Sequence, residues 1–103
     1  MAQIDINNLQ AVDWKADAVT TPHQATAGQE QVFVGFGDFG NSTLSVEHLP
    51  AGSNTWSPVA LLTVNGVATY TATTGMYRIK LSGATGGTTN VSGFIAQVHG
   101  PRA

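Results

Sequence analysis

The sequence predicts an all-β protein, a single small antiparallel β-sandwich that is jelly-roll-like and carries an extended N-terminal arm. After Gly28 the chain is a succession of short β-branched and aromatic runs separated by Gly, Asn, Ser and Pro. No helix-like spacing of apolar side chains appears in that region. The 103 residues suffice for one domain with one hydrophobic core.

The first 28 residues are expected to form the extended arm, and residues 29–103 the sandwich domain. Apolar side chains in the arm are spaced irregularly, and the segment ends in the loop-like stretch TTPHQATAG. A short strand is expected near residues 14–19. A helix of about three turns over residues 7–18 is the alternative, although Asp13 and Asp17 would then repel each other at i, i+4.

The sandwich domain is expected to hold a series of short strands, at residues 31–36, 43–48, 59–64, 67–73, 75–82 and 91–98. Alternation is clearest in the strand at 75–82, where one face carries Tyr77, Ile79 and Leu81. The other face carries Met76, Arg78 and Lys80. This pattern predicts a half-buried strand with its cations directed outward.

The stretch LLTVNGVATYT predicts a β-hairpin. Asn65 and Gly66 both tolerate a positive φ, which a two-residue type I′ turn requires. In that register Val64 lies opposite Val67, and both faces of the hairpin carry apolar groups. A second covering layer or a neighbouring subunit is therefore expected.

The stretch VGFGDFGNST contains a G-x-G-x-x-G pattern at Gly35, Gly37 and Gly40. A dinucleotide site needs a helix after these glycines, whereas the alternating NSTLSVEHL that follows predicts another strand. We therefore interpret the stretch Gly-Asp-Phe-Gly-Asn at residues 37–41 as a turn between two antiparallel strands, in which the glycines and Asn41 take a positive φ.

Composition argues against several kinds of partner. Only 10% of residues are charged, the formal net charge is −2, and the four cations are scattered, at Lys15, Arg78, Lys80 and Arg102. Nucleic acid is therefore not expected as a partner. No apolar run approaches the ~20 residues of a membrane helix, so no membrane partner is expected either. So little surface charge suggests faces covered by other chains.

No catalytic or cofactor site is expected. The chain has no Cys, and His23, His48 and His99 lack ligand spacing with each other or with carboxylates. Neither a calcium loop nor a nucleophile elbow is present. A sugar-stacking platform made by Trp14, Trp56, Tyr70 and Tyr77 is a possibility, with core or subunit packing as the favoured alternative.

Two stretches carry a resemblance to a known family. Residues 49–59 read LPAGSNTWSPV, similar to a Gly-rich turn followed by Trp, with an uncharged residue where the family has Asp. Residues 74–85 read TGMYRIKLSGAT. Together with the following Gly/Thr loop and last strand, they resemble small β-sandwich structural proteins of tailed bacteriophages over about residues 31–98.

The resemblance implies a virion structural protein that is not an enzyme, most like a capsid decoration (cement) protein. Such a protein would be assembled in the host cytoplasm, form a homotrimer and bind the major capsid protein on the capsid surface. We expect its partner or oligomer interface to include residues from the arm and the hairpin, namely Ile4, Ile6, Leu9, Trp14, Leu62, Val64 and Val67. The alternatives are a phage tail or fibre component, a carbohydrate-binding module that uses Trp56 and, last, a small enzyme.

Overall fold

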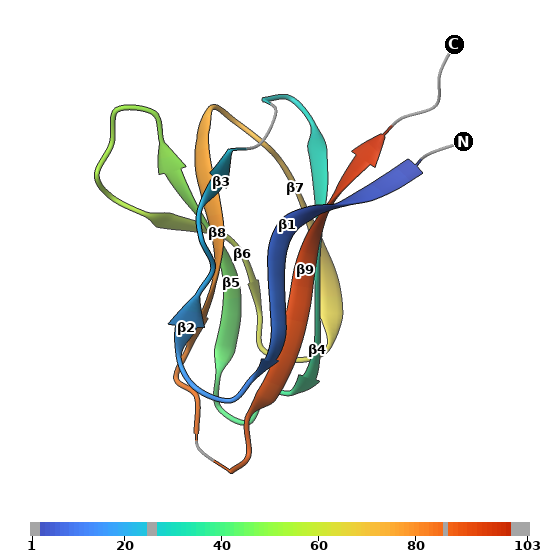
Figure 1. The fold of residues 1–103 in the computed structure, drawn as a ribbon, viewed down its shortest axis with the longest axis vertical. Coiled ribbons are helices and arrows are strands. Elements are labelled where there is room, and N and C mark those ends of the chain that lie inside the picture. Colours follow the sequence, from blue (N-terminus) through green and yellow to red (C-terminus); the bar gives the residue numbers. More distant parts are fainter. Residues whose placement is uncertain (1–2, 25–26, 86, 100–103) are drawn as a thin grey trace.

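The computed structural model describes the backbone of residues 3–24, 27–85 and 87–99, and the side chains of 9–24, 27–85 and 87–97. Over these residues the protein is all-β, with two antiparallel sheets packed face to face and no helix (Figure 1). The strands are β1 (Gln3–Trp14), β2 (Ala18–Val19), β3 (His23–Gln24), β4 (Glu30–Asp38), β5 (Thr43–Pro50), β6 (Ser57–Leu62), β7 (Gly66–Thr71), β8 (Gly75–Ser82) and β9 (Asn90–His99). The expected antiparallel sandwich is confirmed.

Sheet A has the order β1-β9-β4-β7, and sheet B has the order β2-β8-β5-β6, with β3 also paired to β8. Within the described chain only the connections β2–β3 and β5–β6 stay inside one sheet. The other connections cross from one sheet to the other, so neighbours in a sheet are distant in sequence. This alternation agrees with the winding of a jelly roll, which stays a prediction at that level of detail.

The core lies between the sheets and is built by the inward face of each strand. Strand β8 shows the principle, because Tyr77, Ile79 and Leu81 are at most 1% exposed while the alternate residues Arg78 and Lys80 are only partly covered. The predicted half-buried strand is therefore confirmed. The rest of the core comes from both sheets and comprises Leu9, Ala11, Phe33, Phe39, Leu44, Val46, Ala72, Val91 and Ile95.

The predicted hairpin across Asn65–Gly66 is wrong. Strand β6 pairs with β5 in sheet B, whereas β7 pairs with β4 in sheet A, so Val64 and Val67 are not cross-strand partners. Neither Asn65 nor Gly66 has the positive φ that a type I′ turn needs. Crossing between the sheets directs Leu62 into the interior from one side and Tyr70 from the other, and this burial outweighs the local turn preference.

The glycine-rich stretch between β4 and β5 is also a crossing between sheets. Gly37 and Gly40 have φ values of 123° and 58°, as expected, whereas the positive φ expected at Asn41 is wrong. Strand β5 follows this stretch instead of a helix. The two strands do not pair with each other, so that part of the expectation is wrong. A Cβ at position 37 would collide with the Asn90 carbonyl oxygen, and glycine is required there for space as well as for φ.

An arm separate from the sandwich is not confirmed. Strand β1 pairs with β9 as an edge of sheet A, and Leu9 and Ala11 are each only 2% exposed in the core. The alternative helix over residues 7–18 is wrong, because β1 extends to Trp14. Residues before and after position 28 thus contribute to the same interior.

Replacing Leu9 by Ala tests whether β1 is part of the folded unit. We expect a loss of about 3 kcal/mol in the free energy of unfolding, because a fully buried leucine leaves a cavity between the sheets. The control is Val12→Thr on the same strand, where the side chain is 65% exposed and we expect a change within about 0.5 kcal/mol. Urea unfolding measures both. Equal midpoints for the two variants would mean that residues 1–14 lie outside the cooperative core.

Candidate interaction surface

The residues expected at an interface differ in how deeply the structure buries them. Leu9 belongs to the protein's own core, and Trp14 and Leu62 are half-buried against that core. Val64 and Val67 are 68% and 63% exposed, in the β6–β7 connection and on β7. Val64 and Val67 are therefore the most exposed of the five whose side chains are described.

The side chains of Ile4 and Ile6 lie outside the described residues. The backbone register pairs Ile4 with Val98 and Ile6 with Ala96 across β1 and β9. Their place in an interface stays a prediction.

The outer surface of sheet A carries a row of apolar side chains. Since Phe33 faces the core, its neighbours Val32 and Val34 face outward, and Phe36 on the same side is 48% exposed. Pairing places Val34 between Val67 and Phe94, which gives an apolar row across three strands. We call this surface the apolar face, made of Val12, Val32, Val34, Phe36, Val67 and Phe94.

A shallow groove of about 320 Å³ runs along the apolar face where β1 passes over β9. The two register shifts in β1 bend that strand away from regular pairing, between Ile6 and Gln10 and between Ala11 and Trp14. Val12, Phe36 and Phe94 line the groove together with Gln10 and Ser92. Its walls suit an apolar side chain better than a charged one.

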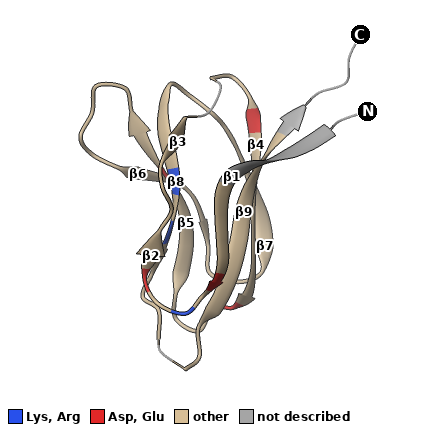
Figure 2. Ribbon diagram, viewed as in Figure 1, with Lys and Arg blue, Asp and Glu red and all other residues tan. Residues whose placement is uncertain are grey.

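Charge is placed at the ends of the apolar face. The four strands of sheet A contain no Lys or Arg. Figure 2 shows acidic residues at the two ends of β4, which are Glu30 and Asp38, with uncharged residues between them. A partner for this surface is therefore expected to be apolar at the centre and neutral or basic at the rim.

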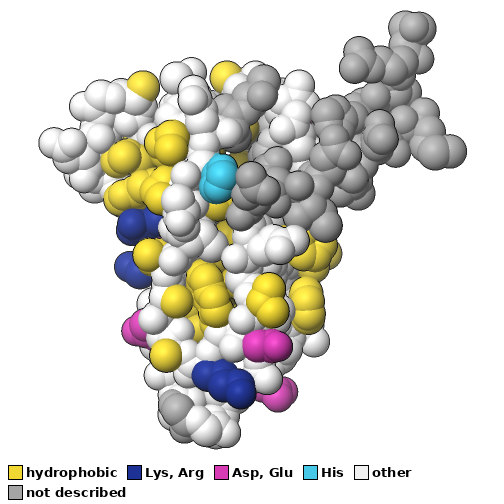
Figure 3. All heavy atoms as spheres, viewed as in Figure 1, with side chains coloured by type: hydrophobic (Ala, Val, Ile, Leu, Met, Phe, Trp, Pro, Cys, Tyr) yellow, Lys and Arg dark blue, Asp and Glu magenta, His cyan; other side chains and the backbone are white. Residues whose placement is uncertain are grey.

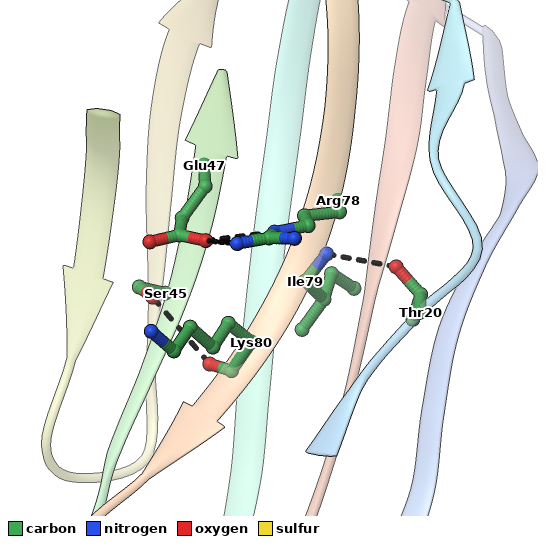
Figure 4. A network of polar contacts seen from close by, with 6 residues as sticks. All are labelled: Thr20, Ser45, Glu47, Arg78, Ile79 and Lys80. Carbon is green, nitrogen blue, oxygen red and sulfur yellow. Dashed lines mark hydrogen bonds and ion pairs between the residues drawn. The ribbon is translucent and has the colours of Figure 1, made fainter. Parts of the chain in front are cut away.

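The outer surface of sheet B has a different character, because its apolar side chains surround cations. The Arg78 guanidinium donates to Glu47 Oε1 from Nε at 2.8 Å and forms an ion pair from Nη2 at 2.7 Å (Figure 4). The same guanidinium lies 4.2 Å above the Trp56 ring. Figure 3 shows Lys and Arg side chains beside a group of hydrophobic ones. The exposed apolar side chains of this sheet include Val19, Val59 and Leu61.

Two side-chain hydrogen bonds to the backbone of β8 come from Thr20, just after β2, and from Ser45 on β5. Thr20 Oγ1 accepts a hydrogen bond from the Ile79 amide at 2.9 Å, and Ser45 Oγ donates to the Lys80 carbonyl at 3.4 Å (Figure 4). These bonds hold the outer surface of sheet B in a fixed geometry.

The aromatic side chains do not form the sugar-stacking platform. Tyr77 is 1% exposed and stacks on Tyr70 at 5.5 Å and on His48 at 4.6 Å between ring centroids, inside one end of the sandwich. Trp56 faces Arg78 on the outer side of sheet B, and Trp14 lies on sheet A. Core packing, the favoured alternative, is therefore confirmed for Tyr70, Tyr77 and Trp14, whereas Trp56 contacts Arg78 outside the core.

The hydrogen bonds of the cluster around Tyr77 are made to the protein's own backbone and support the fold. Tyr77 Oη accepts from the Thr73 amide at 2.8 Å, and His48 Nε2 donates to the Thr74 carbonyl at 3.1 Å. Burial, with a smaller contribution from Tyr77, raises the pKa of the Tyr70 phenol well above its usual value. A phenol with so high a pKa stays neutral at physiological pH and offers no general base.

The glycine motif lies at a recess of about 750 Å³ at one end of the sandwich. Asp38 is the only charged residue in its lining. The Gly37 amide already donates to Asn65 Oδ1 at 2.9 Å, so it is not free to hold a phosphate. With a carboxylate and no cation in the lining, this geometry repels a nucleotide's phosphates instead of binding them.

The described residues also lack two further features, a metal-ligand cluster and a membrane-crossing helix. They contain no group of three or more His, Cys, Asp or Glu side chains that could hold a metal ion. They contain no helix long and apolar enough to cross a membrane.

No protein-family model matches the chain, and neither a curated protein nor a solved structure matches it. What can be inferred about function therefore comes from the surfaces themselves and from the resemblance in residues 49–59 and 74–85.

Sequence reasoning missed five of the six members of the apolar face, namely Val12, Val32, Val34, Phe36 and Phe94. They lie on strands that are adjacent only because β9 sits between β1 and β4. One signal was present: both alternating positions of VFVGF are apolar, so whichever side faced the core, the other had to expose apolar groups.

Replacing Arg78 by Met tests the contacts on sheet B. Because Glu47 is 12% exposed and would lose its ion-pair partner, we expect about 1–2 kcal/mol less stability toward urea. Lys80→Met, on the same face of the same strand, is the control and should change stability by less than about 0.5 kcal/mol. If the two variants unfold at the same urea concentration, the Arg78 contacts contribute nothing to the fold.

Proposed function

We propose that the protein is a virion structural protein that acts by binding instead of chemistry, as a decoration or cement protein on a phage capsid. The observation that carries the binding role is the apolar face, which one sheet presents outward with no cation on any of its four strands. Extended apolar surfaces of this kind are typical of contacts with other proteins. The assignment to a phage shell rests on the resemblance of residues 49–59 and 74–85.

The apolar face supplies the means of attachment. Burying Phe36, which is 48% exposed, would release about 1 kcal/mol, and Val12 and Val67 are exposed still further. The groove between Val12, Phe36 and Phe94 gives an apolar side chain of the partner a place to insert. The residues of the apolar face on β4 and β9 lie on strands that are hydrogen-bonded on both sides, which limits the conformational entropy lost on docking.

The major capsid protein is the proposed partner, and the capsid surface the proposed location. The complementary site on it would be apolar, with neutral or basic residues near Glu30 and Asp38. The homotrimer comes from the resemblance and stays a prediction. Nucleic acid is not a proposed partner, because the few cations are spread over the chain.

The two alternative functions would use different surfaces of the protein. A tail or fibre component would use the same apolar face on another part of the virion. A carbohydrate-binding module loses the support of an aromatic platform, because Trp56 is the only one of the four rings on the outer side of sheet B. A glycan array with wild type and Trp56→Ala would reveal binding by that ring.

Co-sedimentation with undecorated heads of the phage that encodes the chain tests the proposal. We expect Phe36→Ser to bind heads about tenfold more weakly than wild type, because an aromatic anchor is lost from the apolar face. Leu61→Ser is the matched control, since that side chain is 58% exposed on the outer side of sheet B. Circular dichroism must show both variants folded.

Wild-type protein that does not sediment with heads, or a Phe36→Ser variant that sediments as well as wild type, would overturn the proposal. Sedimentation with purified tails instead of heads would favour the tail component. Deleting residues 1–20 is not a suitable test, because it removes Leu9 and Ala11 from the core.

A further inference from the structure

Each sheet ends in strands whose outer backbone groups have no neighbouring strand, and proteins protect such edges against pairing with other chains. Strand β1 is interrupted by two register shifts, and β2 and β3 are two residues long and are separated by a Pro at position 22. Strand β6 contains Pro58 beside a register shift. These three edges thus carry bulges, short strands or proline.

Strand β7 has none of these protections. Its six residues, GVATYT, contain no charge and no Pro, and they pair with β4 without a register shift from Gly66 to Thr71. Its side chains alternate between exposed and half-buried. Such a strand is regular and rich in β-branched residues, which favours pairing along its open side.

The hydrogen bonding shows which backbone groups are open. Just beyond β7, the Ala72 amide donates to the Gln29 carbonyl at 2.8 Å, so Ala72 directs its groups toward the β4 side. In an antiparallel ladder the direction alternates from residue to residue. The N–H and C=O groups of Val67, Thr69 and Thr71 therefore point away from β4.

We propose that β7 pairs antiparallel with β7 of a second copy of this chain about a two-fold axis. Thr69 lies opposite Thr69 of the second copy, and Val67 lies opposite Thr71. This register joins all the outward backbone groups of both strands in hydrogen-bonded pairs. It also keeps the outer side chains of both copies on the same side, because directly opposed residues share a face.

Charge separation favours this arrangement over one in which two apolar faces stack on each other. Two-fold stacking of the faces brings the acidic ends of β4, at Glu30 and Asp38, against acidic ends of the second copy. In the edge-paired dimer the two β4 strands are separated by two intervening β7 strands, about 14 Å apart at ~4.8 Å per strand. That distance exceeds the Debye length of about 8 Å at physiological salt, so the acids hardly repel.

The edge-paired dimer joins both copies of sheet A into one continuous sheet with a doubled apolar face. Because each copy uses its one unprotected edge, assembly closes at two chains and does not continue into a fibre. The inference does not depend on the proposed function. It differs from the homotrimer that the resemblance implies, and the mass in solution distinguishes the two.

Sedimentation equilibrium over a wide concentration range tests the pairing. Wild type is expected to approach twice the mass of one chain as concentration rises. Thr69→Pro should stay folded, because the amide it removes points away from β4, and should dimerise about thirtyfold more weakly or worse, because two central hydrogen bonds are lost.

A charge pair tests the register without proline. Thr69→Lys and Thr69→Glu should each dimerise more weakly than wild type, since like charges meet at the two-fold axis, and a mixture of the two should form a heterodimer. Gln10→Lys, exposed on β1, is the control and should dimerise like wild type. A monomer at all concentrations, a trimer, open-ended growth, or Lys and Glu variants that pair no better mixed than alone would each overturn the inference.

Discussion

The inward row of β8 is the constraint on which the rest of the molecule depends. Its alternation commits Tyr77, Ile79 and Leu81 to the interior, and pairing with β5 sets Val46 beside Ile79 and Leu44 beside Leu81. Sheet A must then cover this row with its own inward-facing apolar side chains, which are Phe33, Val91 and Ile95 from β4 and β9. A one-residue slip in β8 would turn Arg78 and Lys80 into the core, so the register is strongly determined.

Close contact between the sheets depends on two small residues as much as on large ones. Gly35 and Gly93 are cross-strand partners in sheet A. A Cβ at position 93 would come within 2.7 Å of Leu44 Cδ2, and one at position 35 within 2.9 Å of Leu62 Cδ1. The absent side chains thus make room for leucines from sheet B. Leucine side chains of sheet B therefore fill the space that Gly35 and Gly93 leave open in sheet A.

Outside the core, the apolar face and the open edge of β7 are two surfaces with different chemistry. The apolar face offers burial of hydrocarbon without directional bonds, and it suits a partner of complementary shape. The β7 edge offers a row of hydrogen-bond donors and acceptors, whose pairing depends on register. A chain with only 10% charged residues lacks the usual means of keeping either surface apart from other proteins.

Features that depend on neighbours along the chain could be predicted from the sequence: the strands from β4 to β9, the inward side of β8 and the positive φ at Gly37 and Gly40. Sequence reasoning misjudged the Asn65–Gly66 crossing, because a local turn preference of small energy competed with burial of Leu62 and Tyr70 in opposite sheets. Of the interface residues it named, Val67 lies on the apolar face, while Leu9 serves the core. The pairing of β9 with β1 and β4 could not be predicted in this way. Hydrogen bonding between strands that are far apart in the sequence leaves no periodic pattern in the residues of either strand, so this pairing is known only from the folded protein.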